Sequence, residues 1–460
     1  MVVPRAKLLF WVSVIVLPFS VLGFAEPAAV NFCWLAIGAF AMLALADACG
    51  AHTSLAGIGL ELPQVARMSK DREAQLELRI RNVRQRPRTV RVALAMPREV
   101  HSSWDEVSIA LPEGSEWSRL DWACVPRKRG NYRIEIARLE APSILGFWAA
   151  RQTALVQSEI RVYPNLFAER RHLAALFLHR GRFGLHAQRQ IGKGREFEKL
   201  REYVPGDSYD ELHWKATAKR GRPITKVFQI ERTQEVYVVL DASRLSAREV
   251  EAATPAAAHA REGSPGSAPP PSVSTLERFV TAALVLALAA EQQGDLFGLL
   301  TFTDRVERFV RAKNGKAHYS ICRDALYTLE PKVVTPDFED ICTFIRLRLP
   351  RRALLVFLTS LDDPALAASF VRNMDLLRHQ HLVLVNMLQP RGVTPLFSQP
   401  DVRSVDDLYE RLGGHLQWQD LRETEKVLQR RGVHFALLQN ERLSAELVSQ
   451  YLNVKQRQQL

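Results

Sequence analysis

The sequence predicts three structural parts in series: a transmembrane hairpin, an antiparallel β-sandwich, and an α/β domain built on a parallel sheet. Two adjoining apolar runs near the N-terminus predict the hairpin. Alternating apolar and polar residues over 55–165 predict the sandwich. Beyond residue 233, short apolar runs alternate with helical stretches. That pattern predicts the α/β domain, because parallel strands covered by helices on both faces are apolar throughout.

Residues 1–50 are expected to form two transmembrane helices. The runs from Leu8 to Ala25 and from Ala28 to Ala46 are 18 and 19 residues long, close to the ~20 that cross a bilayer. Arg5 and Lys7 precede the first run, and the short connection carries no Lys or Arg. By the positive-inside rule, the N-terminus and the bulk of the chain are then cytoplasmic. A cleaved signal peptide is the alternative, which the immediate start of a second apolar run disfavours.

Residues 55–165 show the period-two pattern of half-buried strands. Leu76, Leu78 and Ile80, for example, alternate with charged residues. Turns rich in Gly and Asn separate the alternating runs. The residue types of a catalytic site are not found in this part of the sequence. We therefore expect it to act as a spacer that presents the next domain.

The α/β domain is predicted over 233–460, with a low-complexity insertion at 250–274 that is too polar and Pro-rich to fold alone. Its predicted strands are Val236–Leu240, Leu296–Phe302, Leu354–Leu358, Leu382–Met387 and Val433–Leu438. Its predicted helices are Leu276–Gln293, Ser320–Leu329, Asp337–Leu347, Pro364–Arg378, Val405–Arg411, Asp420–Arg430 and Ser444–Lys455. In such a domain the ligand site lies at the carboxyl ends of the strands.

Several enzyme classes find no support in the sequence. Neither GxGxxG nor GxxxxGK[ST] follows a predicted strand, so a dinucleotide or nucleotide phosphate site is not expected. No Ser-His-Asp or Cys-His order is convincing, although such triads are spatial arrangements. The five cysteines contain no CxxC pair, which favours reduced, buried thiols. The chain is therefore predicted to be non-enzymatic.

One degenerate metal site is nevertheless predicted at the strand ends. Asp241 and Ser243 follow the first strand in an Asp-x-Ser pattern, and their oxygens suit Mg²⁺. Thr335 and Asp362 could complete the set. Leu245 stands where a second Ser would be expected, and Ser360 where an Asp would be. The alternative is that Asp241 only caps the next segment.

The segment 166–232 is strongly charged. Between Arg170 and Arg232 it holds 15 Lys and Arg against 7 Asp and Glu, while the net charge of the chain is +12. Such an excess favours an anionic partner, either lipid or nucleic acid. Because the acids are interleaved with the bases, an internally paired polar segment is equally open. Between these two the sequence does not decide.

The same segment resembles the signature of domain-of-unknown-function family 58. The resemblance is carried there by Glu196, Arg201, Tyr203, Pro205, Gly206, Asp207, Trp214 and Lys215. Other stretches similar to the family are Arg129–Tyr132, Leu145–Trp148, Val162–Asn165, Gly294–Asp295 and Thr301–Asp304. The resemblance extends over nearly the whole chain, including the paired N-terminal spans.

That resemblance implies a bacterial inner-membrane protein with a von Willebrand factor A-like domain. It implies a protein-binding scaffold or adaptor that works with a MoxR-type AAA+ ATPase and a transglutaminase-like membrane protein. A Mg²⁺ ion completed by an acidic residue of the partner is the mode of binding that the family suggests. Of the metal-ligand positions that the resemblance implies, this chain keeps three: Asp241, Ser243 and Thr335. No nucleic acid is expected by this comparison.

For the signature segment we favour a structural role over a docking role. Its place between the predicted sandwich and the first α/β strand suggests a belt that joins the two domains. Arg201, Asp207 and Lys215 would supply paired charges, and Trp214 one buried ring. On this interpretation, replacing Trp214 destabilises the fold.

Overall fold

The computed structural model describes residues 1–167, 169, 191–204, 209–229, 234–251, 272–396, 398 and 404–457. Pro205, Gly206 and Asp207, and most of the predicted insertion, lie outside the described residues. The chain divides into two compact units, Met1–Asn165 and Leu166–Leu460. Each unit is described below by itself.

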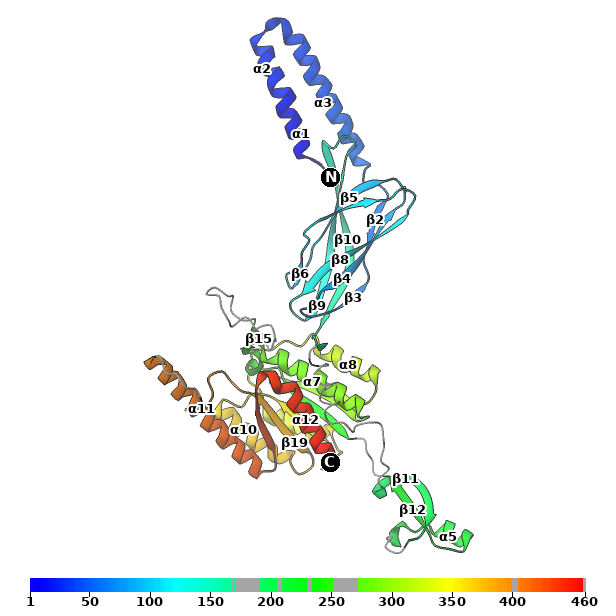
Figure 1. Cartoon of the computed structure of the whole chain (residues 1–460), viewed down its shortest axis with the longest axis vertical. Helices are drawn as coiled ribbons and strands as arrows, with labels where there is room; N and C mark the ends of the chain where they lie inside the picture. The colour runs from blue at the N-terminus through cyan, green and yellow to red at the C-terminus, as the bar shows by residue number, and fades with distance from the viewer. Residues whose placement is uncertain are drawn as a thin grey trace. The chain divides into compact units, whose positions relative to one another are not determined.

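Two N-terminal helical runs, Ala6–Ala25 and Pro27–His52, are long and apolar enough to cross a membrane (Figure 1). Their mean hydropathies are 2.3 and 2.0, and most of their large apolar side chains are exposed rather than packed against protein. These are the two spans that the sequence predicts; the first begins two residues earlier than predicted, and the second runs to His52 rather than Ala46. Their elements are α1 (Ala6–Trp11), η1 (Val12–Val16), α2 (Leu17–Ala25), η2 (Pro27–Ala29) and α3 (Val30–His52).

Two sheets follow in the same unit, with strand orders β1-β10-β9-β5-β7 and β2-β4-β8-β6, and β3 pairs with β10. Leu76, Leu78 and Ile80 of β4 are buried in the core, and Trp122 of β8 is completely buried beside them. The strand formed by residues 2–4, which pairs with β10, was not predicted. The strands are β1 (Val2–Pro4), β2 (Ile58–Glu61), β3 (Val65–Ser69), β4 (Ala74–Asn82), β5 (Arg88–Leu94), β6 (Val100–Ser102), β7 (Val107–Leu111), β8 (Trp117–Pro126), β9 (Gly130–Pro142) and β10 (Trp148–Tyr163).

A buried carboxylate joins the second apolar helix to the sheet. Asp47 of α3 is only 6% exposed. It accepts hydrogen bonds from the Ser143 hydroxyl at 2.6 Å and from the backbone N–H groups of Leu145 at 3.0 Å and Phe147 at 3.2 Å. The indole of Trp148 donates to the carbonyl of Ala44 at 2.9 Å. The turn between β9 and β10, part of the family resemblance, therefore holds the C-terminal end of α3.

The second unit contains a six-stranded sheet with the order β17-β16-β13-β18-β19-β20. All its neighbouring strands are parallel except β17, which is antiparallel to β16. Every predicted strand is present within two residues at either end, whereas β17 was not foreseen, because it is a half-exposed edge strand. The strands are β13 (Glu235–Asp241), β16 (Leu296–Phe302), β17 (Val306–Lys313), β18 (Leu354–Leu358), β19 (Leu382–Leu388) and β20 (His434–Leu438).

Helices cover this sheet on both faces. Alternate residues of β13 enter two separate cores: Val238 packs with α7, α8 and α12, and Val239 with α9, α10 and α11 (Figure 1). This double burial explains why the strand is apolar at every position. The helices are α7 (Thr275–Gln292), α8 (Lys316–Leu326), α9 (Phe338–Arg348), α10 (Pro364–Asn373), α11 (Val405–Arg430) and α12 (Leu443–Gln456), with short 3₁₀ turns η4 (Arg244–Ala247), η5 (Met374–Leu376) and η6 (Asn440–Arg442).

Three helices differ from their predictions: α8 is Lys316–Leu326 rather than Ser320–Leu329, α10 ends at Asn373 rather than Arg378, and α11 is undivided. The sequence pattern divides α11 at Gly413 and Gly414, but the helix runs through both. A Cβ atom on Gly414 would lie 2.0 Å from the carbonyl oxygen of Gly392. Glycine is therefore needed there because the helix passes close to another backbone segment, and not because the helix ends.

The predicted insertion is described only at its two ends. They pair as a short antiparallel ribbon of β14 (Glu249–Glu251) and β15 (Ser272–Ser274). Residues 252–271 lie outside the described part of the chain. The ribbon leads straight into α7, whose first turn is capped by the hydroxyl of Ser274.

Candidate functional site

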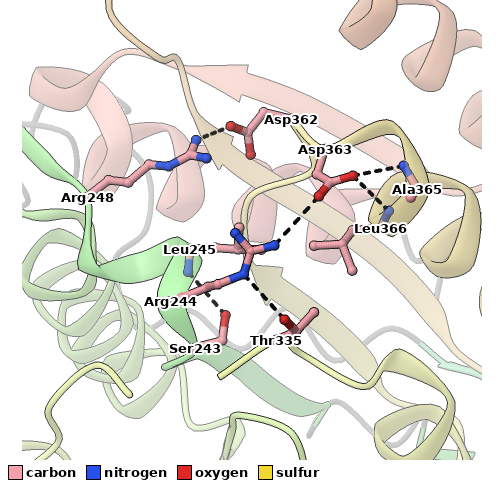
Figure 2. Close-up of polar contacts among 9 residues, drawn as sticks. All are labelled: Ser243, Arg244, Leu245, Arg248, Thr335, Asp362, Asp363, Ala365 and Leu366. Carbon is pink, nitrogen blue, oxygen red and sulfur yellow. Dashed lines mark hydrogen bonds and ion pairs between the residues drawn. The ribbon is translucent and has the colours of Figure 1, made fainter. Parts of the chain in front are cut away.

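The candidate site lies at the carboxyl ends of β13 and β18. If the six strands are numbered 1 to 6 from β13 to β20 in chain order, their order in the sheet is 3-2-1-4-5-6. The connection from β13 to β16 therefore runs toward one edge of the sheet, and the connection from β18 to β19 runs toward the other. Such a reversal opens a crevice at the strand ends, where ligands of open α/β sheets bind. The loop after β13 and the loop between β18 and α10 form the site (Figure 2).

Asp241 ends β13 and is completely buried. Its Oδ1 accepts the backbone N–H of Ser243 at 2.8 Å, and its Oδ2 accepts the hydroxyl of Thr359 at 2.6 Å. Burial raises the pKa of this carboxyl above its ordinary value, and the two hydrogen-bond partners oppose that rise. Asp241 thus ties the end of β13 to the end of β18.

The serines of the same loop face their own backbone. The hydroxyl oxygen of Ser243 accepts the N–H of Leu245 at 3.4 Å at the start of η4. The hydroxyl of Ser246 donates to the carbonyl of Ser243 at 2.9 Å. Leu245 is buried to 1% exposure, which explains why an apolar residue replaces the Ser that a metal loop would have there.

Two arginines lie between the predicted metal ligands. Arg244 donates from Nε to the hydroxyl of Thr335 at 3.4 Å, and its Nη2 lies 3.6 Å from the carboxylate of Asp363. Arg248 forms an ion pair with Asp362. Figure 2 shows both guanidinium groups extending from the loop after β13 toward the two aspartates. Neither arginine was predicted as a site residue, because only residues with oxygen ligands were considered, although both lie in the stretch 241–248.

The four predicted ligands are therefore placed at one edge of the sheet, but each has a different partner. Asp241 and Ser243 are engaged with the protein backbone and with Thr359, while Thr335 and Asp362 contact guanidinium groups. Among the described residues, His, Cys, Asp and Glu side chains form no group of three or more that could hold a metal ion. Two cationic groups among the oxygens do not fit a divalent cation.

The described part of the signature segment from residue 191 onward forms a small hairpin structure. The hairpin of β11 (Ile191–Glu202) and β12 (Ile224–Gln229) carries η3 (Tyr209–Glu211) and α5 (Trp214–Arg220). Its small core contains Leu212 and Ile224. Glu196 pairs with Gln229 in the hairpin ladder, and Tyr203 stacks on Tyr209.

The prediction that Trp214 is a buried ring is wrong. Trp214 is 69% exposed at the first position of α5, followed by the exposed Lys215. The seven-residue α5 contacts the hairpin through Thr217, whose hydroxyl accepts the backbone N–H of Ile224 at 3.0 Å, and none of its residues is fully buried. Sequence reasoning took the aromatic ring as a core residue, but a two-stranded hairpin with one short helix has little interior to bury it.

A family comparison matches this part of the chain. Residues 199–254 and 270–396 match the family model described as "Protein of unknown function DUF58". The match includes the end of the signature segment and the α/β sheet as far as β19. It supports the family resemblance over these residues. No curated protein matches the sequence.

Solved structures give only remote likenesses. The hypothetical protein BatB from Bacteroides thetaiotaomicron is 14% identical, with 49% of this chain and 99% of that chain covered and a TM-score of 0.28. An aerotolerance-related membrane protein from Bacteroides fragilis is 13% identical, with 48% and 98% covered and a TM-score of 0.27. An alpha-2-macroglobulin from Escherichia coli is 23% identical, with 25% of this chain but only 17% of that chain covered and a TM-score of 0.21. TM-scores this low do not establish a shared fold.

Proposed function

We propose that this chain is a membrane-anchored, non-enzymatic scaffold that binds another protein at the carboxyl edge of its α/β sheet. The proposal rests on one observation: the polar groups at that edge are of two kinds, buried ones that pair with each other and arginines that are half-exposed. The buried Asp241 and Thr359 are engaged with each other, and Arg244 and Arg248 remain half-exposed above them. Buried groups fixed in this way support the loops, while exposed charges are available for recognition.

A von Willebrand factor A-like fold for this domain is part of the proposal. The parallel pairs, the strand order and the helices on both faces support it. By the family resemblance, the partner is a MoxR-type AAA+ ATPase, with a transglutaminase-like membrane protein in the same assembly. The family match over residues 199–254 and 270–396 supports the resemblance, and the choice of partner follows from that resemblance alone.

The proposed location is the bacterial inner membrane, with the bulk of the chain in the cytoplasm. The two apolar helices support the membrane anchor. Arg5 and Lys7 before the first helix support the cytoplasmic orientation through the positive-inside rule. A cytoplasmic ATPase could then reach the α/β domain directly.

Co-purification tests the proposal. The full chain with an affinity tag and the MoxR-type ATPase of the same organism would be produced together, extracted from membranes and purified on the tag. We expect the ATPase to elute with the chain, and an unrelated tagged two-span membrane protein to leave it behind. An ATPase that stays in the unbound fraction, with and without Mg²⁺ and ATP, would contradict the proposal.

A second candidate is binding of anionic lipid by the signature hairpin. The specific observation is that Trp214, Lys215 and Lys219 of α5 are all exposed. Trp rings favour the membrane interface, and each Lys or Arg adds about 1 kcal/mol near anionic lipid. In nanodiscs that contain phosphatidylglycerol, amide exchange in α5 should be slower than in neutral phosphatidylcholine, and high salt should remove the difference. Equal exchange in both lipids would exclude this candidate.

A further inference from the structure

Arg244 has hydrogen-bonding capacity that the protein uses only weakly. Among the described residues it makes two contacts, 3.4 Å to Thr335 and 3.6 Å to Asp363, and both are longer than the 2.7–2.9 Å of a charge-assisted hydrogen bond. Its side chain is 43% exposed. A guanidinium group has five N–H donors in a fixed planar fork, so most of this capacity is available to an anion.

The residues that contact Arg244 do not depend on it. Asp363 caps α10, where its Oδ1 accepts the N–H groups of Ala365 at 3.0 Å and Leu366 at 3.5 Å. Thr335 is exposed, so water can replace the guanidinium. Arg244 can therefore turn toward a ligand without leaving a buried polar group unpaired.

The carboxylate of Asp362, at the same edge, has one oxygen that no hydrogen-bond donor among the described residues satisfies. The Asp362 side chain is 4% exposed, and its ion pair with Arg248 uses Oδ2. Its Oδ1 is buried and has no hydrogen-bond partner among the described residues. A buried carboxylate oxygen without a donor is costly, so this atom points to a ligand that supplies an N–H group.

We propose that Arg244 takes the role of the metal ion at this edge, and that the site binds an acidic peptide segment of the partner directly. A Glu or Asp side chain of that segment pairs with the Arg244 guanidinium. A backbone N–H of the same segment donates to Asp362 Oδ1. This inference rests on the proposed protein-binding function and specifies its chemistry: recognition of an acidic segment that is independent of divalent metal.

The chemistry selects a peptide over other anions. An acidic residue in a peptide offers both a carboxylate and an amide N–H, the two groups that Arg244 and Asp362 Oδ1 would pair with. Figure 2 shows Arg244 and Asp362 on the loops after β13 and β18. A phosphate group offers only acceptors, which would meet the buried oxygen of Asp362 unfavourably. The bidentate fork of an Arg is also the geometry that a carboxylate prefers.

The test uses a probe that does not depend on the ATPase. Fluorescein-labelled, amide-capped hexaglutamate would be titrated against the full chain in neutral-lipid nanodiscs and followed by anisotropy, with Mg²⁺ and with EDTA. We expect the same dissociation constant in both buffers. Arg244→Ala should raise it about tenfold or more, and Arg244→Lys should raise it by less, since the charge remains but the fork is lost.

Arg346→Ala is the matched control, because Arg346 is an exposed arginine near the end of α9. This variant should leave the dissociation constant of hexaglutamate unchanged. A hexaglutamine probe, which carries no carboxylates, should not bind. Equal effects of Arg244→Ala and Arg346→Ala, or loss of binding in EDTA, would overturn the inference. Failure of the ATPase to co-purify would instead count against the choice of partner, so the two results can be separated.

Discussion

At the scale of single residues, two fully buried carboxylates hold the α/β domain together at opposite ends of its strands. Asp241 joins the carboxyl ends of β13 and β18. At the other end, Asp295 accepts the N–H of Gln234 at 3.0 Å, a hydrogen bond from the Tyr451 hydroxyl and an ion pair from Lys455 at 2.7 Å. Gly294-Asp295 is one of the stretches that resemble the family, and the structure gives it a structural role.

A buried histidine predicts a dependence of stability on pH. His381 is 4% exposed, neither of its ring nitrogens has a hydrogen-bond partner among the described residues, and burial lowers its pKa to about 4. The unfolded chain, with a His pKa of about 6.5, binds more protons between these values. The free energy of unfolding therefore falls as the pH drops from about 6.5 to 4, by at most about 3 kcal/mol.

His381→Leu should remove this part of the pH dependence, because it leaves no group to protonate. Amide exchange of β19 between pH 4.5 and 7, corrected for intrinsic rates, would measure it. His379→Leu, at the exposed neighbouring histidine, should keep the dependence. Identical pH profiles for the wild type and His381→Leu would show that His381 is not buried in neutral form.

At the scale of elements, the signature hairpin is expected to tolerate loss of its exposed ring. Trp214→Ala should change the stability of α5 and β12 by no more than about 0.5 kcal/mol, as is usual for exposed positions. Ile224→Ala, at a residue of 1% exposure, should cost about 2–5 kcal/mol. Amide exchange of β12 measures both. A loss from Trp214→Ala as large as that from Ile224→Ala would restore the interpretation of a buried ring.

The joint between α3 and the β9–β10 turn gives a further prediction. Asp47→Ala leaves the Ser143 hydroxyl and the N–H groups of Leu145 and Phe147 without their acceptor. Hydrogen bonds to a charged group contribute about 1.5–3 kcal/mol, so these two amides should exchange at least about tenfold faster in nanodiscs. Asp105→Ala, in an exposed loop of the same unit, should leave them unchanged. Unchanged exchange in Asp47→Ala would mean that the turn holds its shape without the helix.

At the scale of the whole molecule, the sequence was most informative where burial follows a simple rule. The parallel strands are apolar at every position because helices cover both faces, and the two spans are recognised by their length. The edge strands β1 and β17 were missed, because β1 has only three residues and β17 is half-exposed and carries charged residues between its apolar ones. Close backbone contacts, as at Gly414, and the placing of Arg244 among oxygen groups depend on segments far apart in the sequence. No local pattern encodes them.

The most direct measurement of the central claim is a footprint of the partner on the chain. Amide exchange of the full chain in nanodiscs would be compared with and without the purified MoxR-type ATPase. Protein docking at the carboxyl edge of the sheet predicts slower exchange in residues 243–248 and 361–366, with little change in the two sheets of Met1–Asn165. Protection confined to β11, β12 and α5, or no protection in these two loops while the ATPase is bound, would contradict it.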